Sequence, residues 1–79
     1  MTDPLTDFVQ TYAPQLASEI TEDTPLIEQG LLNSLLLMNL VAFLDRRIGL
    51  AVPDEEIVPE NFGTLRSIRS LITRLTSEV

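Results

Sequence analysis

Apolar residues recur at helical spacing in three stretches of this 79-residue chain. The first stretch has an i, i+3, i+4, i+7 pattern, which places four side chains on one helix face: Leu5, Phe8, Val9 and Tyr12. Asp3 and Pro4 precede them as a cap and a first-turn proline, and Pro14 cannot continue the helix. The pattern therefore predicts a first helix that ends near Ala13, with a further short turn through Ser18.

The second stretch begins after Asn33, a favoured N-cap residue because its side-chain oxygen accepts a bond from an unpaired first-turn amide. Five apolar positions then form a core-facing stripe: Leu37, Leu40, Val41, Leu44 and Ile48. Gly49 is expected to end this helix. Ser34 occupies the first helical position in this interpretation, where its side chain lies beside the preceding loop and can be exposed.

The remaining chain contains two short elements and a last helix. Residues 52–56 read as a turn that leads into an acidic helical start, where carboxylates are favoured by the helix dipole, and residues 59–62 as one more short turn. Thr64 is the expected cap of a last helix whose apolar residues share one face: Leu65, Ile68, Leu71, Ile72 and Leu75. The pattern thus predicts an all-α protein with three main helices and one short helix, in a single domain over residues 1–79.

A long loop is expected between the first two helices, at residues 19–33. It mixes turn formers and acids with five apolar residues that we expect to be buried anchors: Ile20, Leu26, Ile27, Leu31 and Leu32. Loops of this length inside a small domain are usually either disordered or functional, and the spaced anchors favour an ordered, functional loop.

Composition and charge narrow the classes of partner. The formal net charge is −7, and the first 33 residues carry acids only, so we expect no nucleic-acid partner. The chain has no Cys, which excludes disulfides and thiolate metal ligands. The apolar run over residues 31–44 is shorter than the roughly 20 residues that a membrane span needs, and no signal peptide is visible. We therefore expect a cytoplasmic monomer with no membrane association.

The sequence contains few of the residue patterns that catalysis or metal binding requires. Without His or Cys there is no usual general base to activate Ser34, so a small serine hydrolase is disfavoured. Four acidic residues lie close together in the sequence: Asp54, Glu55, Glu56 and Glu60. They lack the alternating oxygen ligands and the central Gly of a calcium-binding loop, so we expect no metal site there. Arg66 and Arg69 share a helix face, and we expect them to offset nearby carboxylates rather than dock an acidic partner.

The segment from Asp23 to Leu35 reads DTPLIEQGLLNSL. It resembles the phosphopantetheine attachment region of acyl and peptidyl carrier proteins, in which an Asp-Thr-x-Leu loop leads through Gly to an Asp-Ser-Leu triplet at the start of the second helix. The likeness continues through the VPDE turn at residues 52–55 and spans about residues 23–75. It implies the small four-helix bundle of that family. Asn33 stands at the position where the family most often has Asp. An Asn at this position can still cap the helix but lacks the negative charge of Asp.

The resemblance implies that Ser34 bears a covalent 4′-phosphopantetheine, which a phosphopantetheinyl transferase moves from coenzyme A. The thiol of this group would hold acyl or aminoacyl groups as thioesters for an adenylating ligase or a synthase in thiotemplated natural-product biosynthesis. The chain itself would have no catalytic residue. The alternative is a helical adaptor that binds partners and is never modified.

The second-helix residues outside the core stripe are apolar where fatty-acid carriers are acidic. By resemblance, this face looks more like that of peptidyl carriers or carriers of specialised pathways. An exposed apolar surface beside a functional serine favours partner binding. The expected partner-binding residues are Asn33, Leu35, Leu36, Met38, Asn39 and Ala42.

Overall fold

The structure, a computed structural model, describes residues 4–14 and 18–76. Its elements in chain order are α1 (Pro4–Tyr12), α2 (Ser34–Ile48), the 3₁₀ helix η2 (Asp54–Glu56), α3 (Pro59–Phe62) and α4 (Leu65–Thr76). Across these described residues there is no strand, and no helix is long and apolar enough to cross a membrane. The expected all-α architecture of three long helices and one short helix is confirmed.

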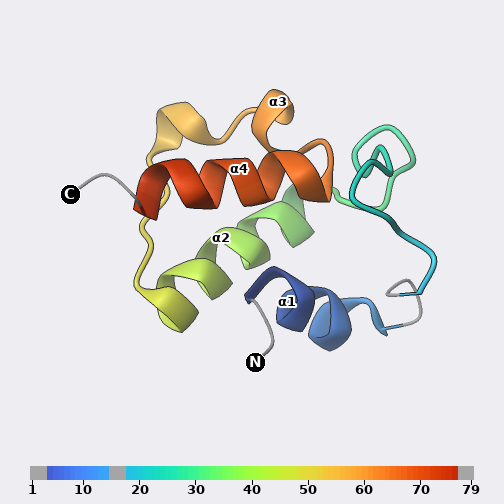
Figure 1. Ribbon diagram of the computed structural model, residues 1–79, viewed down its shortest axis with the longest axis horizontal. Helices are drawn as coiled ribbons and strands as arrows, with labels where there is room; N and C mark the ends of the chain where they lie inside the picture. Colours follow the sequence, from blue (N-terminus) through green and yellow to red (C-terminus); the bar gives the residue numbers. More distant parts are fainter. Residues whose placement is uncertain (1–3, 15–17, 77–79) are drawn as a thin grey trace.

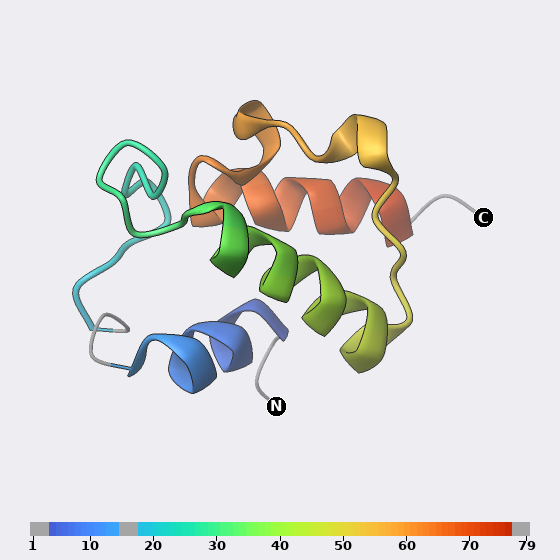
Figure 2. The ribbon, with the colours of Figure 1, turned by 180° about the vertical axis from the view of Figure 1, so that it is seen from behind.

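The helices are arranged around α2 and α4 (Figure 1). α1 lies on one side of α2, while η2 and α3 lie along the opposite side of the molecule, beyond α4; the reverse view in Figure 2 shows the same order. The loop that precedes α2 lies at the end of the molecule where α2 begins. This arrangement leaves one flank of α2 uncovered.

Both ends of α2 are set by the residues that the sequence indicates. The Leu36 amide donates to Asn33 Oδ1 at 2.9 Å, which satisfies one of the unpaired first-turn donors. At the other end Gly49 has a φ of 69°, a left-handed conformation that glycine adopts without strain. The Gly49 amide donates to the Asp45 carbonyl at 2.9 Å, and the helix ends there.

The segment between α2 and α4 differs in detail from the sequence prediction. The acidic start at residues 54–56 is a single 3₁₀ turn, whereas residues 59–62 form the short α-helix, with Pro59 at its first position. Thr64 caps α4, because the Ser67 amide donates to its hydroxyl oxygen at 3.1 Å. The expected cap at Asp3 and most of the expected turn through Ser18 involve residues outside the described part of the chain.

The core is made almost entirely of aliphatic side chains from every element except η2. Its buried members are Leu5, Phe8, Leu26, Leu32, Leu40, Leu44, Leu50, Val52, Phe62, Leu65, Ile68 and Leu71. The predicted burial of Ile48 is wrong, because this residue is 40% exposed. It is the last residue of α2, and the chain then reverses so that the Leu50 amide donates to the Leu44 carbonyl at 3.3 Å. Leu50 is therefore buried where Ile48 was expected.

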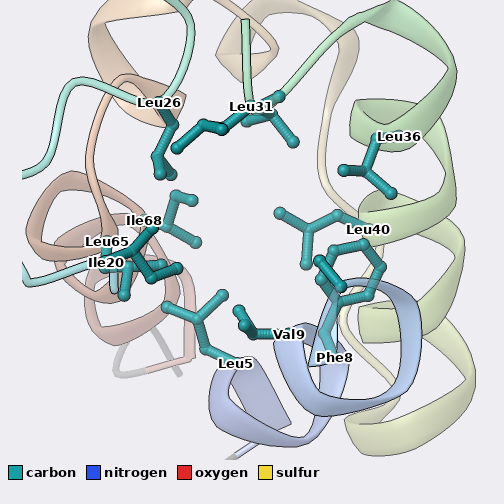
Figure 3. A pocket seen from close by; sticks show the side chains of 12 residues that line it. Leu5, Phe8, Val9, Ile20, Leu26, Leu31, Leu36, Leu40, Leu65 and Ile68 are labelled. Carbon is teal, nitrogen blue, oxygen red and sulfur yellow. The ribbon is translucent and has the colours of Figure 1, made fainter. Parts of the chain in front are cut away.

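A small apolar cavity of about 40 Å³ remains inside this core, between α1, the loop, α2 and α4. Figure 3 shows side chains from all four segments directed toward it. They include Phe8 from α1, Leu26 from the loop, Leu40 from α2 and Ile68 from α4. Ser34 is not among the residues that line the cavity.

Candidate functional site

Ser34 is the first residue of α2 and is exposed. Its place follows from the Asn33 cap, which directly precedes the first helical residue and fixes the backbone from which the hydroxyl projects. The first turn of α2 contains no acidic residue, so the positive end of the helix dipole beside Ser34 is not offset by a carboxylate from that turn. This is a favourable position for a negatively charged group on the serine oxygen.

The loop before Ser34 is closed by its own backbone. The Leu26 carbonyl accepts bonds from the Leu31 amide at 2.8 Å and the Leu32 amide at 3.1 Å. Gly30 has a φ of 72°, which favours glycine and allows the chain to reverse there. Leu26 and Leu32 are buried as predicted, but Ile27 is 37% exposed, because it lies at the outer side of this closed turn. The expectation that Ile27 is a buried anchor is therefore wrong.

The start of the loop is attached to the first turns of α4. The Leu26 amide donates to the Gly63 carbonyl at 2.7 Å, and the Arg66 amide donates to the Glu22 carbonyl at 3.0 Å. The Arg66 guanidinium donates to both carboxylate oxygens of Asp23, at 2.8 and 3.1 Å, which lowers the pKa of that carboxyl from its ordinary value. These contacts hold residues 22–26 of the loop against the start of α4, although the two segments are far apart in the sequence.

A second ion pair reinforces this attachment. Arg69 Nε donates to the Glu22 carboxylate, with distances of 2.9 and 3.0 Å to its two oxygens. The structure thus agrees with the expectation that Arg66 and Arg69 offset nearby carboxylates. The identity of those carboxylates could not be derived from the sequence, because they lie 43 and 47 residues away.

An open groove of about 410 Å³ runs beside Ser34. One wall comes from the loop and the start of α2, and the other from residues 57–59 between η2 and α3. Its lining residues are Ile27, Gly30, Leu32, Asn33, Ser34, Leu37, Ile57, Val58 and Pro59. Sequence reasoning did not connect residues 57–59 with the serine, because periodicity within one element carries no information about which segments meet across a groove.

The uncovered flank of α2 is apolar next to Ser34. Leu35 is 74% exposed and Met38 is 54% exposed, and Ala42 one turn further is also exposed. These three residues define the α2 apolar face. Large exposed apolar side chains at helical spacing are unusual in the absence of a partner.

Three other residues assigned to partner binding are placed differently from one another. Asn33 is exposed, whereas Asn39 is half-buried. Leu36 is half-buried, packs against the core and lines the internal cavity, so its expected place on the outer face is wrong. The reason is that Leu36 lies on the side of α2 that faces the core: Figure 3 shows its side chain directed toward the same cavity as Phe8 of α1.

The chemistry available to Ser34 is that of an acceptor. The chain contains no His and no Cys, and among the described residues no hydrogen bond to the Ser34 hydroxyl is present. No group of three metal-ligating side chains occurs in residues 4–14 and 18–76. The hydroxyl is exposed, and in the described part of the chain no side chain that could act as its base is hydrogen-bonded to it.

Comparison with known proteins gives a family and a structural match. The family model described as the phosphopantetheine attachment site matches residues 4–75. A solved chain from a crystal structure described as that of an FAD-dependent dehydrogenase is 33% identical and superposes with a TM-score of 0.68. The match covers 89% of this chain and 93% of that one, so the two chains are nearly equal in length. A search of curated protein sequences gives no match.

Proposed function

Because this chain belongs to the phosphopantetheine attachment family, whose members carry a covalent 4′-phosphopantetheine and are not themselves catalysts, we propose that Ser34 is the attachment residue. The observation that carries the proposal is the exposed hydroxyl at the capped first position of α2, on the rim of an open groove. Residues 1–79 form the carrier domain in this proposal.

The modification is a phosphoryl-type transfer that a partner enzyme performs. The Ser34 oxygen attacks the phosphorus atom that bears the pantetheine in coenzyme A, and the bond from that phosphorus to the nucleotide breaks. Adenosine 3′,5′-bisphosphate leaves, and the hydroxyl proton passes to a base of the phosphopantetheinyl transferase. The absence of a base beside Ser34 is consistent with this division of roles, since the transferase supplies the activation.

Once attached, the prosthetic group carries the reactive chemistry. Its thiol forms a thioester with an acyl or aminoacyl group, while the protein contributes delivery and a high local concentration at each docked enzyme. We place the carrier in thiotemplated biosynthesis, with an adenylating ligase or a synthase as the enzyme that loads it. The carrier acts as a monomer in the cytoplasm, where coenzyme A is available as the donor.

The structural match supports one further class of partner. The matched chain is nearly equal in length to this carrier, and its crystal structure is described as that of an FAD-dependent dehydrogenase. A thioester makes the neighbouring C–H bond more acidic. A base of a partner dehydrogenase could then remove that proton, and the FAD of that partner would supply the hydride acceptor for the next carbon. A dehydrogenase that acts on the tethered group is therefore part of the proposal.

The α2 apolar face is the proposed docking surface, with Leu35 and Met38 as its main contacts. Asn33, Asn39 and the half-buried Leu36 are the further residues of α2 and its cap that we assign to partner binding. The same exposed face is the observation that favours the alternative function, an unmodified helical adaptor. The two functions differ in whether Ser34 ever receives the prosthetic group.

An intact-mass experiment separates these two functions. The apo-protein is incubated with coenzyme A and a broad-specificity phosphopantetheinyl transferase, alongside the Ser34→Ala variant. The parent is expected to gain the mass of one phosphopantetheine, and Ser34→Ala is expected to gain none while it keeps the parent's circular dichroism spectrum. A parent that stays unmodified would favour the adaptor, and a mass gain that persists in Ser34→Ala would place the attachment on another residue.

A further inference from the structure

The two ion pairs between the loop before Ser34 and α4 form one network. Arg66 donates to both carboxylate oxygens of Asp23, and Arg69 Nε lies at 2.9 and 3.0 Å from the two carboxylate oxygens of Glu22. Hydrogen bonding to Asp23, together with the negative charges of Asp23 and Glu22, raises the pKa of Arg66 above its ordinary value. Arg66 is therefore influenced by both carboxylates. These four residues are the ion-pair network.

Backbone hydrogen bonds join the same two segments. The Arg66 amide, one of the first-turn donors of α4 that has no acceptor within the helix, donates to the Glu22 carbonyl at 3.0 Å. The Leu26 amide donates to the Gly63 carbonyl at 2.7 Å, directly before the cap of α4. Figure 2 shows the loop, the start of α2 and the start of α4 at the same end of the molecule. The loop and α4 therefore hold each other at that end.

A single closed turn connects these anchored residues to the serine. The Leu26 carbonyl accepts bonds from the amides of Leu31 and Leu32, and both Leu26 and Leu32 are buried. Asn33, the cap of α2, follows Leu32 directly, and Ser34 comes next. A loop that separates from α4 therefore disturbs the turn from which the cap and the serine continue.

The other two acids of the loop make no such contact. Glu19 and Glu28 are exposed, and neither has an ion pair within the described part of the chain. The loop thus contains two carboxylates that attach it to α4 and two that contribute charge alone. A partner that senses only the charge of the loop would respond to both kinds, whereas a role in positioning belongs to Glu22 and Asp23 alone.

From these contacts we propose that Glu22 and Asp23 are positioning residues for the transfer of phosphopantetheine to Ser34. The ion-pair network keeps the turn over residues 26–32 closed and held to α4, and this closed form presents the serine for reaction. The inference rests on the proposed function and adds residues that do not touch the reacting atoms. Loss of the network lowers the fraction of carrier in the closed form, which raises the KM for the carrier and leaves kcat unchanged.

A pair of charge-matched variants tests this role. E22Q/D23N removes both ion pairs, whereas E19Q/E28Q removes two loop carboxylates that have no ion pair. Every substitution keeps the size of its side chain and the bonds of its backbone. Initial rates of transfer from saturating coenzyme A by a broad-specificity transferase are measured against carrier concentration. We expect KM to rise by about threefold in E22Q/D23N, a modest effect because exposed ion pairs are individually weak. E19Q/E28Q should keep the parent's KM, and both variants should keep its kcat.

Amide hydrogen exchange gives a second readout that needs no transferase. The amides of Leu31 and Leu32 report on closure of the turn, and the Leu40 amide in the core reports on unfolding of the whole domain. E22Q/D23N is expected to accelerate exchange at Leu31 and Leu32 by about threefold and more than at Leu40. Thr64→Ala, which removes a cap of α4 and no contact to the loop, should accelerate exchange at Leu40 and leave the turn unchanged.

The inference would be overturned if KM and exchange at the turn in E22Q/D23N stayed at the parent values. An equal rise of KM in E19Q/E28Q would also reject it, because the transferase would then sense the charge of the loop and not its position. The pair itself is tested by D23N/R66Q, which should transfer no more slowly than D23N; additive losses would show that the two side chains act separately. A parent that gains no phosphopantetheine contradicts the proposed function instead.

Discussion

Replacement of Asn33 by alanine removes a single, well-defined interaction and tests whether the cap positions Ser34. The Leu36 amide donates to Asn33 Oδ1 at 2.9 Å, and alanine offers no acceptor in its place. Loss of an N-cap of this kind costs about 1 kcal/mol. For a domain of this size that corresponds to a decrease of about 4–8 °C in Tm. Thermal unfolding followed by circular dichroism measures the change directly.

Asn33→Asp separates the cap from the charge. Aspartate keeps an acceptor oxygen and adds a negative charge at the positive end of α2, so stability is expected to stay near the parent value, with any gain below about 1 kcal/mol. The charge should change only the rate of phosphopantetheine transfer. Alanine at position 33, in contrast, should lower both the stability and the transfer rate, because the first turn that presents Ser34 becomes frayed.

Thr64→Ala is the matched control for a general loss of stability. Thr64 caps α4 through the same type of bond, a backbone amide to a side-chain oxygen, here from Ser67 at 3.1 Å. It should lower Tm by a similar amount and leave transfer to Ser34 unchanged at temperatures far below unfolding. The reasoning would be refuted by an Asn33→Ala variant that melts like the parent, or by transfer rates that fall equally in Asn33→Ala and Thr64→Ala.

Two other perturbations test the docking face and the ion pairs. Met38→Glu is expected to weaken loading by a cognate ligase or synthase by about tenfold or more, because burial of a methionine side chain is worth about 1.5–3 kcal/mol. The measurement is the apparent KM for the carrier across a salt series. A steep salt dependence of this KM in the parent, together with an unchanged KM in Met38→Glu, would contradict apolar docking. Arg74 lowers the pKa of Glu56 by hydrogen bonding to its carboxylate. The pair therefore stabilises the folded protein fully at pH values above 4.5, the ordinary pKa of a Glu carboxyl group, and this stabilisation is lost as the pH falls through the lowered pKa. Arg74→Gln should therefore be less stable than the parent at pH 7 and equally stable in strong acid; urea unfolding across pH would show a constant difference if the pair did not matter.

The helices and their ends were predictable because each signal is local. Asn33 and Gly49 delimit α2 through bonds to residues three or four positions away, so the spacing of apolar and capping residues contains the information. Exposure of the helix positions was less predictable. Leu36 and Ile48 were assigned to the wrong environments, because the position of α1 and the reversal after Gly49 decide which side chains are covered.

The surroundings of Ser34 required the tertiary structure. The resemblance of the loop to carrier proteins predicts Ser34 as the attachment residue, but it does not predict the contacts that hold the loop. Glu22 and Asp23 pair with arginines of α4 that lie more than 40 residues later in the chain. Residues 57–59, from another segment, form the second wall of the groove beside Ser34. Such pairings depend on how the elements pack, which hydrophobic periodicity does not encode.

The internal cavity has a consequence for how long a cargo survives. Its volume of about 40 Å³ is well below the roughly 150 Å³ that accommodates a benzene-sized guest in a protein interior. A group tethered at Ser34 would therefore stay outside this cavity while the helices keep this arrangement, in the open groove or in water, where hydrolysis could reach its thioester. Under the proposed function, the yield of such a carrier depends on the speed of each handover compared with the rate of spontaneous hydrolysis. Fast transfer to the next enzyme, rather than burial of the thioester inside the carrier, would then limit the loss of cargo by hydrolysis.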